Sequence, residues 1–290
     1  ARSVTGLPAW GTDGQLVSTI GSAKEFAGGT ATAGAAATLT NSAKTWATNM
    51  WANYQARIKS GTGAGQIRTI ASNTGTVLTV SAAWTVNPDA TSVYAIEGNA
   101  DFMYLLGNNA VTIYRFQIST NTWTQLTPTA ARAGAMGAGG SANWIDSALN
   151  WDNETSIPHT TGSTILKQNG RYIYSFRGGG SSTLDVYDIA ANTWISGLAY
   201  GNQTETFNSG SYSCDINGNI FLQKEGTGRS FKFDVSKNLI QSLSTNVTPQ
   251  GTTLVGNRMF VLPYTDGAVE INFLYSIIHT STILNRCLLV

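Results

Sequence analysis

Short apolar stretches alternate with glycine-containing turns over the second half of the chain. The clearest unit spans residues 163–189, where three strand-like stretches are separated first by Asn169-Gly170 and then by the glycine run 178–180. Asn-Gly favours the positive φ angles of a two-residue hairpin turn, and short alternating runs of this length favour strands. The pattern predicts a unit of strand, tight turn, strand, glycine turn and strand.

The same order of elements occurs four times. The other copies start near residues 92, 211 and 252, and the stretch 92–96 is the expected first strand of the earliest copy. Each third strand ends in an apolar, polar, apolar triplet, which places the outer two side chains on one face. We therefore predict at least four antiparallel sheets between residues 91 and 277, with middle strands at 102–106, 172–176, 220–223 and 259–262.

Two of the copies carry a tryptophan soon after the third strand, in Asn121-Thr122-Trp123 and Asn192-Thr193-Trp194. A hydrophobic strand, a glycine turn, a strand ending in an aromatic residue and then a tryptophan is the order of a Kelch-type β-propeller blade, and residues 91–290 resemble that family. The resemblance implies sheets arranged around an axis, with both tryptophans packed between neighbouring sheets. It implies no activity, because one fold carries many functions.

Residues 29–90 have a different pattern. Alternating stretches at 55–59 and 66–70 flank the glycine loop 61–66, and a third strand-like stretch follows at 77–80. A phosphate-binding loop ends in Lys-Ser/Thr and precedes a helix, and this loop has neither feature. We therefore predict a hairpin loop that binds no nucleotide.

Several particular residues follow one another along this region of the chain. They are the run 38–40, Trp46, the loop 61–66, Arg68, the turn 72–74, Trp84 and the run 88–94. Taken together, they are similar to a small β-module of virion structural proteins of tailed bacteriophages. The resemblance implies a non-enzymatic part of the phage particle, in the head, neck or tail, whose partners are other virion proteins and copies of itself.

Composition narrows the range of partners. Charged residues are 11% of the 290, and 17 Lys and Arg oppose 16 Asp and Glu for a net charge of +1, so there is no basic surplus to neutralise nucleic-acid phosphates. The longest apolar stretches, such as 273–278, are far too short for a membrane helix. We expect no nucleic-acid or membrane partner. The whole chain is predicted to be all-β, with an N-terminal arm at 1–28, the small β-module at 29–90 and a Kelch-like β-propeller at 91–290.

One insertion concentrates residues that could carry chemistry. It spans 141–161, between the first two propeller copies, and contains Trp144, Trp151, Asp152, Glu154 and His159. Two carboxylates beside aromatic rings are typical of a glycosidase or sugar-binding site, and carboxylate oxygens also bind Ca²⁺. The alternative is a loop that packs against a neighbouring subunit or caps the propeller.

We favour the packing loop, and hence no catalytic residue, no cofactor and no metal. Cys214 and Cys287 are too far apart in sequence to form a short ligand motif, and His279 lies in an apolar stretch. The function predicted from the sequence is a structural virion component without enzymatic activity. The alternative function is a propeller that binds or cleaves host surface glycans, with contacts from the five residues of the insertion.

Overall fold

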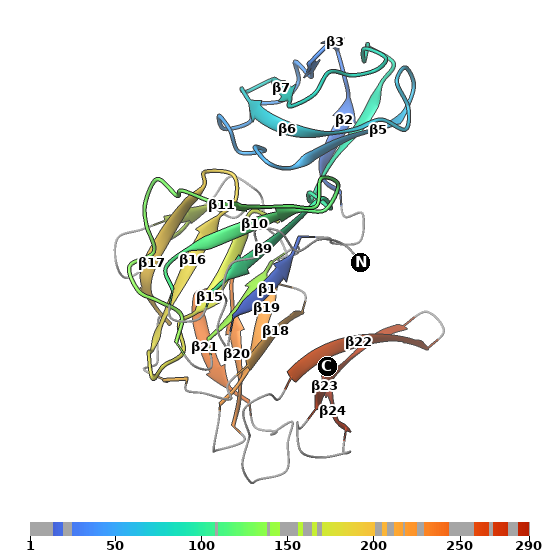
Figure 1. Ribbon diagram of the computed structural model, residues 1–290. Coiled ribbons are helices and arrows are strands. Elements are labelled where there is room, and N and C mark those ends of the chain that lie inside the picture. The colour runs from blue at the N-terminus through green and yellow to red at the C-terminus, as the bar shows by residue number, and fades with distance from the viewer. Residues whose placement is uncertain are drawn as a thin grey trace.

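The computed structural model describes the chain as strands joined by turns and loops (Figure 1). It describes residues 14–19, 25–107, 110–137, 140–145, 170–200, 205–207, 218–224 and 229–243, and the backbone of strands at 156–158, 164–166, 212–216, 258–266, 269–277 and 284–289. Every regular element in these ranges is a strand, which confirms the predicted all-β class. The same residues include no helix with the length and apolar character needed to cross a membrane.

Residues 25–97 form a seven-stranded antiparallel sheet, which we call the N-terminal sheet. Its order is β2-β8-β5-β6-β7-β4-β3. Strands β2 and β3 are consecutive in the chain, yet they lie at opposite edges of this sheet. The sheet is therefore curled, which brings its two edges close together. The strands are β2 (Glu25–Thr30), β3 (Ala33–Ala35), β4 (Thr38–Thr40), β5 (Gln55–Ser60), β6 (Ile67–Asn73), β7 (Val77–Val80) and β8 (Val93–Glu97).

Alternate residues of these strands are buried in the interior of the N-terminal sheet. Ile58 on β5, Ile70 on β6, Leu78 on β7 and Tyr94 on β8 are fully buried. Burying one such side chain contributes about 1.5–3 kcal/mol relative to leaving it in water. The three strands and the hairpin loop at 61–66 that the sequence predicts are confirmed.

Three four-stranded antiparallel sheets follow, and each has the same strand order from inner to outer edge (Figure 1). The first is β1 (Gln15–Ser18), β9 (Phe102–Leu106), β10 (Ile113–Gln117) and β11 (Thr122–Gln125). The second is β12 (Ser141–Trp144), β15 (Tyr172–Phe176), β16 (Thr183–Asp188) and β17 (Thr193–Ala199). The third is β18 (Tyr212–Ile216), β19 (Asn219–Gln223), β20 (Ser230–Asp234) and β21 (Leu239–Ser242). The predicted middle strands of these three sheets are confirmed.

The turn between the third and fourth strands is the same in all three sheets. It contains an asparagine with positive φ: Asn121 at 55°, Asn192 at 48° and Asn238 at 52°. Asparagine tolerates this region better than most residues other than glycine. The turn sets equivalent cross-strand pairs, which are Phe116 with Trp123, Tyr187 with Trp194, and Phe233 with Ile240.

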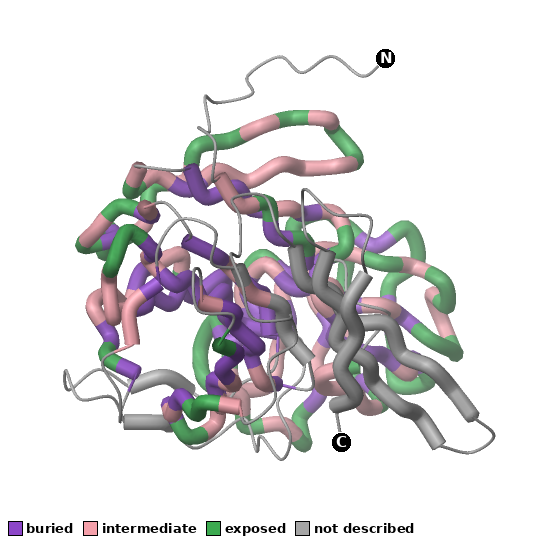
Figure 2. Tube along the Cα trace, turned by 90° about the horizontal axis from the view of Figure 1, so that it is seen from below, coloured by how far each residue is buried: buried purple, intermediate pink, exposed green. Residues whose placement is uncertain are grey.

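Apolar layers lie between successive sheets, and Figure 2 shows buried positions gathered in the interior. The layer between the first and second sheets contains Trp194, which is 4% exposed, so its predicted packing role is confirmed. The same prediction is wrong for Trp123, which is only partly buried and belongs to neither layer. The layer between the second and third sheets is aromatic: Tyr172, Tyr174, Phe176, Tyr200, Phe207, Phe231 and Phe233.

The remaining described strands form two smaller sheets. Strands β13 (Ser156–Pro158) and β14 (Thr164–Leu166) pair with each other. The prediction that the stretch before Asn169-Gly170 is the first strand of the second unit is therefore wrong, because β12 and not β14 pairs with β15.

Strands β22 (Arg258–Asp266), β23 (Val269–Ile277) and β24 (Leu284–Leu289) form a three-stranded sheet in that order, which we call the fourth sheet. Among the described strands, β22 pairs only with β23. The first strand of this copy, expected near residue 252, lies outside the described residues, so the prediction that 259–262 is a middle strand stays a prediction. The inner strands contact in succession: β1 with β12, β12 with β18, and β18 with β22.

The expected first strand of the earliest copy is also wrong. Residues 93–97 form β8, which pairs with β2 and β5 inside the N-terminal sheet. The inner strand of the first sheet is instead β1, which pairs with β9. The N-terminal sheet is therefore inserted, in chain order, between the first two strands of that four-stranded sheet. The sequence analysis places residues 15–18 in an N-terminal arm, and only long-range pairing shows that they supply this strand.

Candidate functional site

Trp144 lies at the end of β12 and is 7% exposed. Its Nε1 donates a hydrogen bond of 2.8 Å to the carbonyl of Gly170, and its ring meets Phe26 edge to face with centroids 6.4 Å apart. A tryptophan buried with its N–H satisfied is a packing residue. The expectation that Trp144 contacts a partner or a glycan is therefore corrected, because its ring is covered by the N-terminal sheet.

The other four candidates of the insertion are Trp151, Asp152, Glu154 and His159. All of them lie outside the described residues. Their predicted roles therefore stay predictions, and the site is built below from the described charged residues.

Asn53 connects the N-terminal sheet to the first two four-stranded sheets. Its Nδ2 donates to the carbonyl of Ile189, its Oδ1 accepts from Arg115, and its carbonyl accepts from Asn99. Asn53, Asn99 and Ile189 line a small, mainly apolar cavity of about 10 Å³, which is close to the smallest volume that holds one water molecule. Through Asn53, direct hydrogen bonds hold the N-terminal sheet against the first and the second four-stranded sheets.

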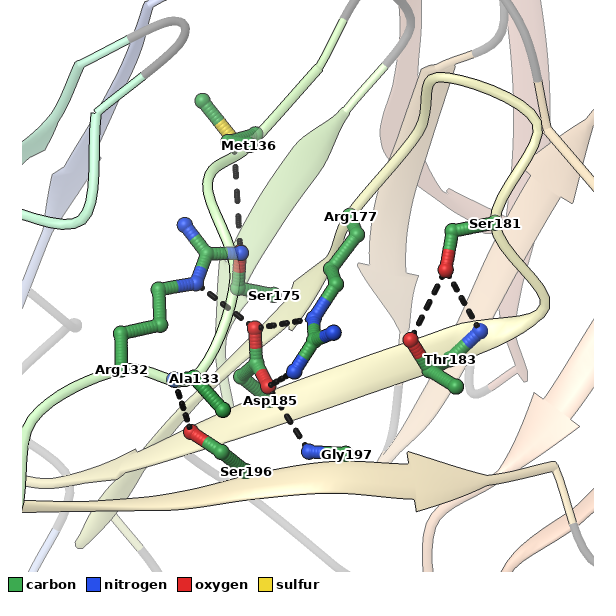
Figure 3. Close-up of polar contacts among 10 residues, drawn as sticks. All are labelled: Arg132, Ala133, Met136, Ser175, Arg177, Ser181, Thr183, Asp185, Ser196 and Gly197. Atoms are coloured by element: carbon green, nitrogen blue, oxygen red, sulfur yellow. Dashed lines mark hydrogen bonds and ion pairs between the residues drawn. The ribbon is translucent and has the colours of Figure 1, made fainter.

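A buried charged cluster lies in the second sheet around Asp185, whose side chain is fully buried (Figure 3). Its Oδ2 accepts from Nε of Arg132 at 2.7 Å and from Nε of Arg177 at 2.9 Å. Its Oδ1 accepts from Nη2 of Arg177 at 2.7 Å and from the amide of Gly197 at 2.9 Å. We call Arg132, Arg177 and Asp185 the arginine–aspartate cluster.

This geometry holds Asp185 as a carboxylate but leaves it no capacity for chemistry. Burial alone would raise the pKa of Asp185, but the hydrogen bonds and positive charges of Arg177 and Arg132 outweigh burial and lower it. An ionised carboxyl group has about four lone-pair sites, and four donors occupy them here. Asp185 cannot take up a proton or approach a substrate without losing a buried hydrogen bond.

Arg132 contacts residues that are distant from it in the sequence. It belongs to the connection between the first and second sheets, and its side chain is 1% exposed. Its Nη2 donates to Oγ of Ser175 at 2.8 Å, and its guanidinium lies 5.1 Å from the ring centroid of Trp194. The neighbouring amide of Ala133 donates to Oγ of Ser196. The cluster fastens this connection to three strands of the second sheet.

A second buried ion pair has the same character. Both Nε and Nη2 of Arg171 donate to the carboxylate of Asp188, which also accepts from the amide of Ala191. Bidentate arginine–carboxylate pairs are strong and geometrically specific. The pair holds the start of β15 against the end of β16. In the N-terminal sheet, Arg57 engages Glu97 across β5 and β8 in a similar way.

The glycine loop 61–66 uses its amides within the protein. The amide of Thr62 donates to Oγ1 of Thr91, that of Ala64 to Gly61, that of Gly65 to Ile58, and that of Gln66 to Gly63. Phosphate loops bind anions through free backbone N–H groups. This network gives a physical reason for the prediction that the loop binds no nucleotide.

The motif residues that follow the loop hold a distant segment in place. Oε1 of Gln66 accepts from the amides of Thr85 and Val86, and its Nε2 donates to the carbonyl of Val86. Arg68 donates to the carbonyl of Ala83 and to Oγ1 of Thr85. The spacing of the motif therefore reflects one connected hydrogen-bond network between the loop and residues 83–86.

Sequence reasoning missed the arginine–aspartate cluster. The available signal is Asp185 itself, a charged residue between Leu184 and Val186 in a strand that is otherwise apolar at this point. Charged residues are rarely fully buried unless they are paired. The two arginines are 53 and 8 positions away, and no local pattern identifies them as the partners.

Among the described residues, no group of three or more His, Cys, Asp or Glu side chains could hold a metal ion. Comparison of the chain with models of known protein families gives no match, and neither does comparison with curated proteins.

Proposed function

We propose that the chain is a non-enzymatic structural component of a tailed-phage virion, in the head, neck or tail, that works through contacts with other virion proteins and with copies of itself. The observation that carries this proposal is the hydrogen-bond network of loop 61–66, Gln66 and Arg68 in the N-terminal sheet. These are the residues in which the chain resembles virion proteins. Their role in this protein is to hold loops together, which supports a structural part.

The buried charges favour the same class of function. An active site needs reactive groups that are free to accept or donate protons. In the arginine–aspartate cluster and in the Arg171–Asp188 pair, the carboxylates are already saturated or bidentately bound. The arginine–aspartate cluster stabilises the connection between the first and second sheets, and the Arg171–Asp188 pair stabilises the pairing of β15 with β16.

We also propose that the four successive sheets are blades of a Kelch-like β-propeller into which the N-terminal sheet is inserted. Support comes from the succession of inner-strand contacts from β1 to β22 and from the apolar layers between neighbouring sheets. The three equivalent asparagine turns support a repeated blade. Stacking several small sheets buries faces that each sheet alone would expose.

Quantitative mass spectrometry of gradient-purified phage particles tests the virion assignment. We expect the chain to co-purify with the particles at a fixed ratio to the major coat protein, because symmetric assemblies contain each structural part in a set number of copies. Recovery of the chain only from the free protein fraction of the lysate would contradict the assignment.

The absence of glycan cleavage is a separate prediction. We expect the purified chain to release no reducing sugar from host envelope polysaccharide, and the Glu154→Gln and Asp152→Asn variants to equal the unmodified chain. Catalytic carboxylates lose orders of magnitude in rate on such substitution. Sugar release that disappears in Glu154→Gln would overturn the non-enzymatic proposal and favour a glycan-cleaving propeller.

A further inference from the structure

The contact between the first and second four-stranded sheets is repeated between the second and third sheets. At the first interface, the ring of Tyr104 on β9 meets that of Tyr187 on β16, with centroids 6.0 Å apart and planes at 54°. At the second, Tyr174 on β15 meets Phe233 on β20 at 6.2 Å and 53°. Both pairs join the second strand of one sheet to the penultimate residue of the third strand of the next sheet. The two interfaces therefore have the same geometry.

The asparagine turns supply a second repeated contact. Nδ2 of Asn192, in the second sheet, donates to the carbonyl of Thr127 at 3.1 Å. Nδ2 of Asn238, in the third sheet, donates to the carbonyl of Ala199 at 3.3 Å. Ala199 is the last residue of β17, and Thr127 lies just beyond the end of β11. Each of these two turns therefore binds the outer strand of the preceding sheet.

The first sheet carries the same two receiving groups. Phe116 is the penultimate residue of β10, which is the position of the aromatic residue at both interfaces. Asn121, with a φ of 55°, occupies the same turn as the two asparagines that donate. The inner-strand contacts run from β1 to β22, so in a closed ring the sheet that precedes the first is the fourth sheet.

We propose that the fourth sheet of the same chain closes the ring on the first sheet, and that Nδ2 of Asn121 donates to the backbone carbonyl at the end of β24, at Leu289. In the order β22-β23-β24, the inner strand β22 contacts β18, so β24 corresponds to the outer strands β11 and β17. This inference rests on the proposed propeller, and it specifies the interface at which the ring closes and the segment that occupies it.

The connectivity of the chain favours its own fourth sheet over that of a second copy. The fourth sheet is covalently joined to the third, and β22 contacts β18. A segment held in this way is present near the first sheet at a high effective concentration, against which a free second copy must compete.

Distances between pairs of spin labels test this closure. Three pairs are equivalent, because each has one label just before a turn asparagine and the other at the end of the preceding outer strand. They are Ala191 with Thr127, Lys237 with Ala199, and Thr120 with Leu289. Each pair is introduced as two cysteines in the full chain with Cys214→Ser and Cys287→Ser, and the labelled chain is mixed with an excess of unlabelled chain. We expect the distance between positions 120 and 289 to match the two reference distances and to be unaffected by the unlabelled chain.

The reference pairs separate failure of the closure from failure of the propeller. A longer distance between positions 120 and 289, with both reference distances short, would overturn the closure and leave the stacked sheets intact. A short distance that disappears in the excess of unlabelled chain would also overturn it, because a second copy would then supply the closing sheet. Long distances in the reference pairs would contradict the proposed propeller itself.

The variant Asn121→Gly isolates the proposed hydrogen bond. Glycine adopts positive φ without strain, so the substitution removes the side-chain amide and preserves the turn. We expect the distance distribution between positions 120 and 289 to broaden in Asn121→Gly, whereas the matched variant Asn192→Gly should broaden only that between positions 191 and 127. An unchanged distribution in Asn121→Gly would overturn the role assigned to Asn121.

Discussion

Replacing Asp185 by asparagine is expected to lower the free energy of unfolding by about 3–5 kcal/mol, because the change leaves Arg132 and Arg177 buried without a counter-charge. Arg132 is 1% and Arg177 is 18% exposed, so water does not compensate for the lost carboxylate. Urea unfolding followed by tryptophan fluorescence measures this loss. Arg132→Met should have a smaller effect, since Asp185 and Arg177 remain as a neutral pair.

The matched control is Glu25→Gln. Glu25 pairs with Lys59 at 2.7 Å, but their side chains are 41% and 39% exposed, and surface pairs contribute at most about 1 kcal/mol. If Asp185→Asn were no more destabilising than Glu25→Gln, the arginine–aspartate cluster would not have the structural role described here.

The same cluster makes stability depend on pH. The pKa of Asp185 is lowered from its usual 3.8 in the folded protein, so its contribution to stability is complete above the pKa of the unfolded chain. This contribution is lost as the pH falls through the folded-state pKa. The unmodified chain should therefore lose stability at acidic pH more steeply than Asp185→Asn, when both are measured by urea unfolding over a pH series.

A second large effect is expected from Gly61→Ala in the glycine loop. Gly61 has a φ of 76°, and a Cβ there would lie 2.0 Å from the backbone carbonyl oxygen of Thr91. The left-handed conformation costs a non-glycine residue about 1–2 kcal/mol, and forcing atoms into a packed site adds about 1–3 kcal/mol. We expect Gly61→Ala to destabilise the N-terminal sheet by the sum of these two effects.

Gly65→Ala separates backbone conformation from steric overlap. Gly65 has a φ of 87°, but a Cβ there would meet nothing within 4 Å. Its substitution should lower the free energy of unfolding by only about 1–2 kcal/mol. Equal losses for the two variants in urea unfolding would show that the contact between Gly61 and Thr91 has no energetic role.

The local pattern of apolar, polar and turn residues was sufficient to predict many of the strands. Alternation around loop 61–66 predicts β5 and β6, and the repeated units predict β9, β15 and β19 as middle strands. These predictions succeed because side-chain period and turn chemistry are properties of adjacent residues. The equivalence of Trp123 and Trp194 follows from the same repeat.

Long-range pairing was not predictable from these patterns. The sequence places residues 93–97 in the first propeller copy and residues 15–18 in an N-terminal arm, and only the folded chain shows that β8 pairs with β5 and that β1 pairs with β9. The arginine–aspartate cluster joins Arg132 to Asp185 across 53 positions and therefore leaves no local spacing to detect. Trp144 was expected on a contact surface because the sequence alone does not reveal that the N-terminal sheet covers it.

Cryo-electron microscopy of the intact phage particle tests the central claim most directly. The account predicts density for the seven-stranded N-terminal sheet beside the stacked four-stranded sheets, repeated at symmetric positions in the head, neck or tail and in contact with neighbouring subunits. A particle map in which every protein density is assigned and none of it fits these sheets would contradict the claim that this chain is a structural part of the virion.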